Sequence, residues 1–210
     1  MKRSVIAAML AVLIAVGVAS ASGGPSLLHP KSLHKTAPAT FLAKFTTTNG
    51  SFVVKVTRAW APRGADRFYN LVYYHFYDNQ PFYRVQQGFL AQWGISMTPA
   101  IAKAWKTAYI KDEPMIHKDG KGTIAFAHVL GVKNSRTTQV FVNLRFNNLG
   151  PSFPSFGVVT KGLSVVAGLY HGPDSVAANA HQDYLAKYGA HFVHANYPHL
   201  DWIKTARIVG

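Results

Sequence analysis

The chain has 210 residues, of which 49% are hydrophobic and 13% aromatic, and its formal net charge is +14. This composition is typical of a globular protein with one core and excludes a disordered chain. The absence of cysteine excludes a disulfide framework, a thiol nucleophile and a cysteine-bound zinc site. The basic residues are scattered and form no nucleic-acid motif. The charge therefore favours membrane surfaces, cell-wall polymers or acidic proteins as partners, and not nucleic acid.

The first residues have the layout of a secretory signal peptide. Two basic residues precede an apolar run from about Val5 to Val18, and Ala19-Ser20-Ala21 offers small residues for cleavage. The alternative is a retained membrane anchor, but the run is shorter than the roughly 20 residues that a span needs. We expect a signal peptide over residues 1–21, which would send the protein to the periplasm or the exterior. Residues 22–40, rich in Ser, Gly and Pro, predict a flexible lead-in.

The chain after this lead-in is predicted to open with a β-hairpin and a helix. Phe41 to Thr48 and Ser51 to Thr57 are alternating runs with β-branched residues, and Asn49-Gly50 between them is a strong hairpin signal. Pro62 suits the first turn of a helix, because an N–H group at that position has no partner within the helix and proline loses nothing by lacking it. An apolar stripe then predicts a helix over about 62–74, and its members are Ala65, Phe68, Leu71 and Val72.

The middle and end of the chain predict a β-rich domain. From Phe82 to about Val159, short apolar runs alternate with Gly, Asn, Ser and Pro, which favours a barrel or a sandwich. Residues 161–170 predict a second helix, and 203–209 a closing strand. The segment 172–199 is interpreted as a surface insertion without an assigned role. No second domain boundary is visible, so we expect one domain over 41–210. The clearest strand signals are 123–127, 139–144 and 156–160.

Ordered sequence blocks carry a family resemblance. Residues 82–94 (FYRVQQGFLAQWG) place an Arg before a Gly-Phe, an apolar residue and a Gln. Residues 122–127 (GTIAFA) and 134–143 (NSRTTQVFVN) follow, and then come Leu149 and residues 153–159 (FPSFGVV). In this order the blocks resemble the cyclophilin family of peptidyl-prolyl cis/trans isomerases, in a bacterial-type, exported form. The resemblance implies a mainly β fold, with a closed eight-stranded antiparallel barrel capped by two helices.

The same resemblance implies a set of site residues. Arg84, Phe89 and Gln92 would be catalytic, with Arg84 donating a hydrogen bond to the nitrogen of the twisted amide. No cofactor and no metal is implied, and the expected partners are proline-containing peptides and unfolded exported proteins. The sequence does not determine the oligomeric state, and a monomer is favoured. The residues that would bind the substrate are Leu90, Ala127, His128, Gln139, Phe141, Leu149 and Phe153.

The chemistry explains why such residues suffice. Rotation about a peptide bond meets a barrier of about 18–20 kcal/mol, and uncatalysed exchange before proline takes roughly tens to hundreds of seconds. A catalyst must bind the twisted amide better than either planar form. A fixed guanidinium beside an apolar pocket can do so where water is removed.

Alternation along one predicted strand supports a groove. Gln139 and Phe141 share one face, whereas Val140 and Val142 face the other side. A glutamine and a phenylalanine on the same face suit a half-open groove better than a dry core.

The ten histidines raise a metal hypothesis. His191, His194 and His199 lie close together in the sequence, with His181 upstream. The spacing of three between the first two suits one helix face. Pro198 opposes a helix that continues to His199, and no acidic residue lies among the three. We favour a solvated surface loop.

The rival function is a binding module on the same barrel. It would hold a proline-containing partner or an anionic surface without useful turnover. Loss of two basic residues with the signal peptide would lower the net charge from +14 to +12, which still favours anionic surfaces. The chain also has His128, Asn148 and Phe153 at positions where the family commonly has Asn, Trp and His.

Overall fold

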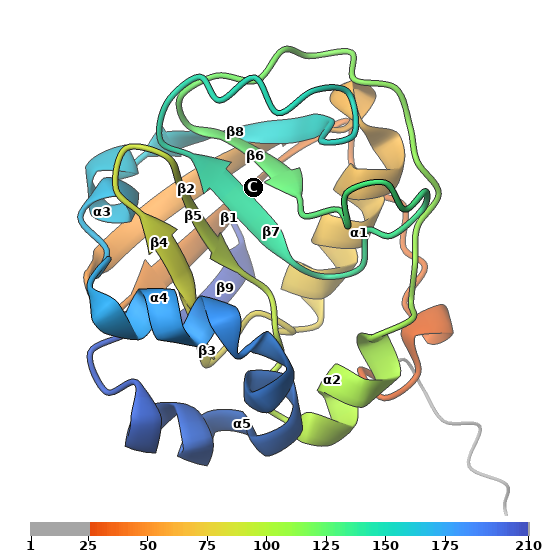
Figure 1. Cartoon of the computed structure of the whole chain (residues 1–210). Helices are drawn as coiled ribbons and strands as arrows, with labels where there is room; N and C mark the ends of the chain where they lie inside the picture. The colour runs from red at the N-terminus through yellow and green to blue at the C-terminus, as the bar shows by residue number, and fades with distance from the viewer. Residues whose placement is uncertain (1–25, 210) are drawn as a thin grey trace, which may run out of the picture.

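The computed structural model describes residues 26–209 (Figure 1). The predicted signal peptide, residues 1–21, lies outside the described residues. Between residues 26 and 209, none of the helices combines the length and the apolar character that a bilayer span requires.

The described chain folds into one curled antiparallel sheet with helices around it (Figure 1). The strands are β1 (Thr40–Thr47), β2 (Gly50–Thr57), β3 (Gln80–Pro81), β4 (Arg84–Gln86), β5 (Leu90–Trp93), β6 (Thr123–Phe126), β7 (Val140–Asn143), β8 (Ser155–Lys161) and β9 (Trp202–Ile208). The helices are α1 (Pro62–Tyr73), α2 (Pro99–Trp105), α3 (Leu163–Ala167), α4 (Pro173–Ala180) and α5 (Gln182–Asn196), with 3-10 turns η1 (Pro30–Ser32) and η2 (Arg58–Trp60).

The sheet corrects the predicted barrel. It has nine strands in the order β3-β9-β1-β2-β8-β6-β7-β5-β4, and its two ends, β3 and β4, do not pair. The expected closed eight-stranded barrel is therefore wrong, while the mainly β fold is confirmed. β3 and β4 follow one another along the chain, with only residues 82 and 83 between them. β3 is only two residues long and includes Pro81, which has no N–H to donate. The outer side of β4 is bonded to a helix, as described below.

The first hairpin forms where the sequence predicts it, with a turn shifted by one residue. Thr47 pairs with Gly50, so Thr48 and Asn49 form the loop in place of the predicted Asn49-Gly50. The Thr47 hydroxyl closes this turn because it donates to the Gly50 carbonyl at 2.9 Å. Gly50 accordingly has a positive φ of 123°, a conformation that glycine adopts without strain.

Helix α1 confirms the predicted apolar stripe. Ala65, Phe68, Leu71 and Val72 are all fully buried. No side chain of the preceding residue caps the helix; instead the Glu113 carboxylate accepts from the N–H groups of Arg63 and Gly64, at 2.7 and 2.9 Å. A carboxylate at this end also complements the positive pole of the helix dipole.

The described part of the predicted lead-in is residues 26–40, of which Thr40 already begins β1, and residues 26–39 are held against the domain. Backbone N–H groups of Lys35 and Ala37 donate to Asn70 Oδ1 and Asp66 Oδ1 of α1, at 2.9 and 2.8 Å. Apart from η1 this segment follows an irregular path.

The segment 172–199 differs most from its prediction. It contains the helices α4 and α5, and not a solvated loop, and α4 lies along β4 (Figure 1). The buried residues of the two helices are Ser175, Ala178, Leu185, Gly189 and Val193; their spacing is helical, but three of the five are small, so the apolar stripe is weak. Gly189, at φ 68°, interrupts α5 in the middle. These two features hide both helices from periodicity analysis.

Two further helices depart from the sequence prediction. The helix expected over 161–170 is shorter, because Lys161 still belongs to β8 and α3 covers only Leu163–Ala167. Gly162, at φ 74°, makes the turn between strand and helix. Helix α2, which begins at Pro99, was not predicted. The predicted strands at 123–127, 139–144, 156–160 and 203–209 are confirmed as β6, β7, β8 and β9.

The core lies inside the curl of the sheet. It is dominated by aromatic rings in edge-to-face and tilted contacts, a geometry that stabilises beyond simple area burial. Its largest apolar members are Phe45, Phe52, Phe68, Tyr77, Phe82, Trp93, Trp105, Phe126 and Phe156.

Gly94 allows β5 to pass close to the segment before β7. A Cβ atom at Gly94 would lie 2.6 Å from Gln139 Cα and would also meet the Thr138 carbonyl oxygen, and its φ is 116°. We expect Gly94→Ala to lower the free energy of unfolding by about 2 kcal/mol or more, as measured by urea denaturation. Gly131→Ala is the matched control, because Gly131 also has a positive φ but open space around it. An equal effect of both variants would contradict the close-approach argument.

Candidate active site

All ten residues predicted for the site line one open groove. Its cavity volume is about 830 Å³. The predicted residues come from strands β4, β5 and β7, from the turn before β5 and from the loops after β6 and β7. The predicted residues in the lining are Arg84, Phe89, Leu90, Gln92, Ala127, His128, Gln139, Phe141, Leu149 and Phe153.

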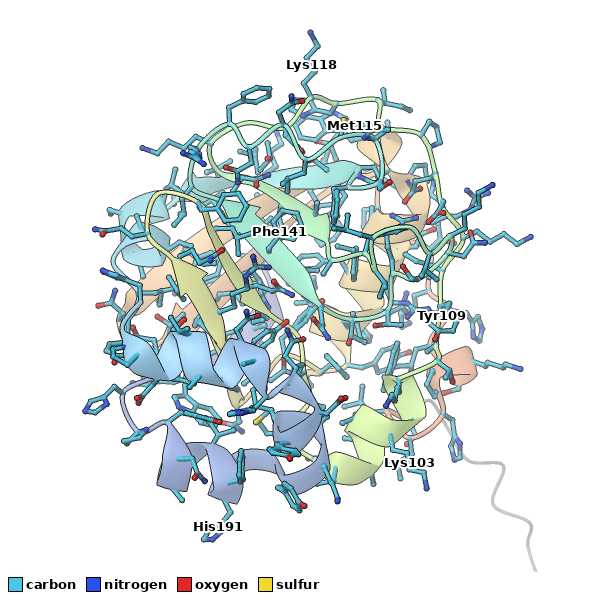
Figure 2. The ribbon with its side chains drawn as sticks, in the orientation of Figure 1. Lys103, Tyr109, Met115, Lys118, Phe141 and His191 are labelled. Carbon is cyan, nitrogen blue, oxygen red and sulfur yellow. The ribbon has the colours of Figure 1, made fainter. Side chains whose placement is uncertain are left out.

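An apolar cluster forms the floor of the groove. Leu90 and Phe141 are almost fully buried and pack with Ala125, while Leu149 and Phe153 are partly buried against them. The ring of Phe153 stands edge-on to that of Phe141, with centroids 5.8 Å apart. Figure 2 shows Phe141 in the middle of β7. The cluster is separate from the main core, because Val140 and Val142 point into that core as the alternation predicts.

Arg84 is held beside this floor by two neutral amides. Its Nη1 donates to Gln92 Oε1 at 3.1 Å, and its Nη2 donates to Gln86 Oε1 at 3.0 Å. Its Nε is buried and has no hydrogen-bond partner. The guanidinium carbon lies 6.0 Å from the ring centroid of Phe89. Because amides do not neutralise the charge, the guanidinium keeps a free donor and a positive charge beside an apolar surface.

Burial also acts on the electrostatics of Arg84. It lowers the pKa of Arg84 from its ordinary value, because a half-buried charge loses part of its hydration. The nearby Tyr83 acts in the opposite direction.

A chain of amides continues from Arg84 across the groove. Gln92 Nε2 donates to Gln139 Oε1 at 3.0 Å, and the same oxygen accepts from the Tyr83 hydroxyl at 2.6 Å. These bonds fix which way both amides point. The Gln139 nitrogen is not used in this chain of bonds and can serve as a donor to a peptide.

The wall opposite Arg84 is formed by the loop after β6. The Ala127 N–H donates to the Gln139 carbonyl at 2.8 Å, which ties this loop to the start of β7. The His128 ring is nearly buried and packs edge-on against Phe153, with centroids 5.9 Å apart. His128 Nε2 lies 3.8 Å from Asp112 Oδ1.

Sequence reasoning missed several residues of the groove. Val129 and Leu130 form an exposed apolar rim, and Tyr109 lies on the segment that leaves α2 (Figure 2). Gln182 reaches the groove from α5. The motif gave no signal for these residues, because they come from segments outside its blocks. Lys106, Ser135, Thr137 and Asn148 complete the lining.

The histidines near the C-terminus make separate contacts. His194 stacks on Trp202, with ring centroids 4.3 Å apart, and His199 Nδ1 lies 3.0 Å from Asp174 Oδ2. His181 Nδ1 lies 2.7 Å from the hydroxyl of Tyr197. Within residues 26–209, no three His, Cys, Asp or Glu residues come together in a way that could hold a metal ion.

The curled antiparallel sheet thus presents an arginine, two glutamines and an apolar floor in one groove. In a comparison with protein-family models, residues 42–187 match the family described as cyclophilin type peptidyl-prolyl cis-trans isomerase/CLD. The chain belongs to this family.

Solved structures share the fold. A cyclophilin-type peptidyl-prolyl cis-trans isomerase from Cryptosporidium parvum matches with a TM-score of 0.60 and 15% identity, over 81% of this chain and 98% of that one. A structure of that isomerase in the presence of the dipeptide Ala-Pro matches with a TM-score of 0.59 and 15% identity, over 80% and 99% of the two chains. A cyclophilin from Hirschia baltica matches with a TM-score of 0.56 and 15% identity, over 85% of this chain and 80% of that one.

Proposed function

We propose that this protein accelerates cis/trans exchange at Xaa-Pro bonds in extended segments of exported proteins. The observation that carries the proposal is the setting of Arg84. Two amides fix its guanidinium, its Nε is left without a partner, and it lines the same groove as the apolar floor of Leu90 and Phe141.

The proposed reaction is a rotation without bond breakage. When the amide before proline twists, resonance is lost and the imide nitrogen regains a lone pair that accepts a hydrogen bond. Arg84 donates to that lone pair while the proline ring rests on Phe141 and Leu149. The donor acts more strongly on the twisted form than on either planar form, so it lowers the barrier and does not merely tighten binding.

The remaining predicted residues hold the peptide. The Gln139 amide and the backbone of Ala127 and His128 lie along the same groove and would bind the chain on either side of the proline. Backbone contacts of this kind give little sequence preference beyond the proline. Phe153 stands against Phe141 and closes the proline pocket from the side of the β7–β8 loop.

An exchange assay tests the proposal. NMR exchange spectroscopy on a short Ala-Pro peptide, with and without the purified protein, gives the catalysed rate directly. We expect the interconversion of cis and trans signals to accelerate at substoichiometric protein. An unchanged rate at saturating peptide, despite peptide binding seen by chemical-shift changes, would reject catalysis and favour the binding module.

The binding module stays the second candidate because of the charge of the surface. Each of the eight acidic side chains already contacts a partner within the protein: Asp66, Asp78, Asp112, Glu113, Asp119, Asp174, Asp183 and Asp201. With a net charge of +14, the basic side chains then dominate the surface. Binding to anionic vesicles that weakens steeply with salt would support this candidate, and binding unaffected by salt would oppose it.

Export is a separate part of the proposal and rests on the sequence of residues 1–21 alone. Mass spectrometry of the protein from its native host gives the mature N-terminus. We expect cleavage after the small residues Ala19-Ser20-Ala21. An intact N-terminus would favour the retained anchor.

A further inference from the structure

The strand that carries Arg84 is the last strand of the sheet. β4 pairs with β5 on one side, and within the described residues no strand follows it on the other. An edge strand leaves N–H and C=O groups unpaired along its outer side. A three-residue strand in that position needs another element to hold it.

Ser175 of α4 takes the place of a neighbouring strand. Its Oγ accepts from the Val85 N–H at 2.7 Å and donates to the Val85 carbonyl at 3.3 Å. Ser175 is 1% exposed and Val85 is 2% exposed, so water does not compete for these bonds. One hydroxyl thus forms hydrogen bonds with both the N–H and the C=O of Val85, the residue that follows Arg84.

Tyr83, on the other side of Arg84, connects the same helices to the amide chain. Its ring is fully buried in a cluster that includes Leu185 and Val193 of α5. Its hydroxyl donates to Gln139 Oε1, the oxygen that also receives Gln92 Nε2. Burial raises the pKa of Tyr83, so the phenol keeps its proton and remains a donor.

We infer that the α4–α5 segment positions Arg84 for the exchange reaction, with Ser175 and Tyr83 as its two positioning residues. Ser175 fixes the backbone of β4, and Tyr83 fixes the amide chain that orients the guanidinium. Neither residue lines the groove, so neither touches the peptide: Ser175 acts through the backbone beside Arg84, and Tyr83 acts through the Gln139 and Gln92 side chains. The inference rests on the proposed function, and it assigns a role to a segment that the sequence leaves unexplained.

The decisive variant is Tyr83→Phe, which removes one hydroxyl and keeps the buried ring. We expect the exchange rate of bound Ala-Pro peptide, measured by NMR, to fall about tenfold, because small displacements of a catalytic group can cost up to about a hundredfold. The peptide Kd should stay within about twofold, because the apolar floor is unchanged. A purely structural role would instead reduce the folded fraction and leave the rate per folded molecule unaltered.

Tyr197→Phe is the matched control. Tyr197 belongs to the same buried cluster, and its hydroxyl contacts His181 Nδ1 at 2.7 Å, away from the amide chain. We expect this variant to keep the wild-type exchange rate. An equal fall in both variants, or no fall in Tyr83→Phe, would overturn the inference.

Ser175 is tested by a pair of substitutions. Ser175→Ala should lower the exchange rate of the bound peptide while Ser175→Thr, which keeps a hydroxyl, should restore most of it. Circular dichroism shows whether each variant is folded. If Ser175→Ala does not fold, the result for Tyr83→Phe alone decides whether the inference holds. A full rate in folded Ser175→Ala would remove Ser175 from the proposal.

Failure of this inference is distinguishable from failure of the proposed function. If Arg84→Ala abolishes exchange while Tyr83→Phe and Ser175→Ala do not affect it, only the positioning role is rejected. If the wild-type protein does not accelerate exchange at all, the proposed function itself is rejected.

Discussion

Replacement of Arg84 with alanine is expected to lower kcat/KM for Xaa-Pro exchange by about a hundredfold or more. Loss of one preorganised donor to a developing charge or lone pair typically has an effect of roughly this size. The affinity for a proline peptide should change little, because Leu90, Phe141 and Leu149 still form the apolar floor. NMR exchange spectroscopy measures the rate, and a peptide titration measures the Kd.

Two further arginine variants make this prediction specific. Arg84→Lys keeps the charge but loses the planar fork that two amides hold, so it should recover little activity. Arg145→Ala is the matched control, because the Arg145 guanidinium also lies over the Phe89 ring, at 5.7 Å, but outside the groove. If Arg145→Ala were as damaging as Arg84→Ala, a general cationic effect near Phe89 would replace the donor mechanism.

The parts of the fold that the sequence predicts are those with local signals. The first hairpin follows from alternation on both sides of a glycine turn, and α1 from a proline start and one apolar stripe. The order of strands has no local signal, because many neighbours in the sheet are far apart in the sequence. β3 and β4 are also hard to detect, since they are only two and three residues long. Helices α4 and α5 were missed for a different reason: the small buried residues Ser175, Ala178 and Gly189 leave only a weak apolar stripe, and Gly189 also breaks α5.

The candidate site, too, is predictable from the sequence only where a local motif marks its residues. Nine of its ten predicted residues lie in the motif blocks and His128 directly follows one; the structure gathers all ten in one groove, although their individual roles stay predictions. The contacts that α4 and Tyr83 make around Arg84 were not predictable. The Ser175 hydroxyl meets the Val85 backbone across 90 residues of sequence, and a serine in an unassigned segment carries no sign of that pairing. Only the position of Tyr83, directly before Arg84, offered a hint.

The buried pair of Arg136 and Glu113 leads to the largest expected effect on stability. Arg136 is fully buried; its Nη1 donates to Glu113 Oε1 at 2.8 Å and its Nη2 donates to the Lys111 carbonyl at 2.6 Å. Glu113 in turn caps α1, so the pair joins this helix to the segment that leads into β7. Arg136→Ala leaves a buried carboxylate without its counter-ion. We expect the free energy of unfolding to fall by about 3–5 kcal/mol.

Urea denaturation measures this loss, with the slope of the transition as a check that the unfolded state is unchanged. Arg58→Ala is the control, because Arg58 and Asp66 form an ion pair with bonds of similar length, 2.7 and 2.8 Å, that is partly exposed. That variant should lower the free energy of unfolding by only up to about 1 kcal/mol, since water and salt screen exposed pairs.

The double variant Arg136→Met with Glu113→Gln removes both charges and should recover part of the loss, because no uncompensated charge is then buried. Equal losses for Arg136→Ala and Arg58→Ala would show that the buried pair is not what joins α1 to the β7 side of the groove.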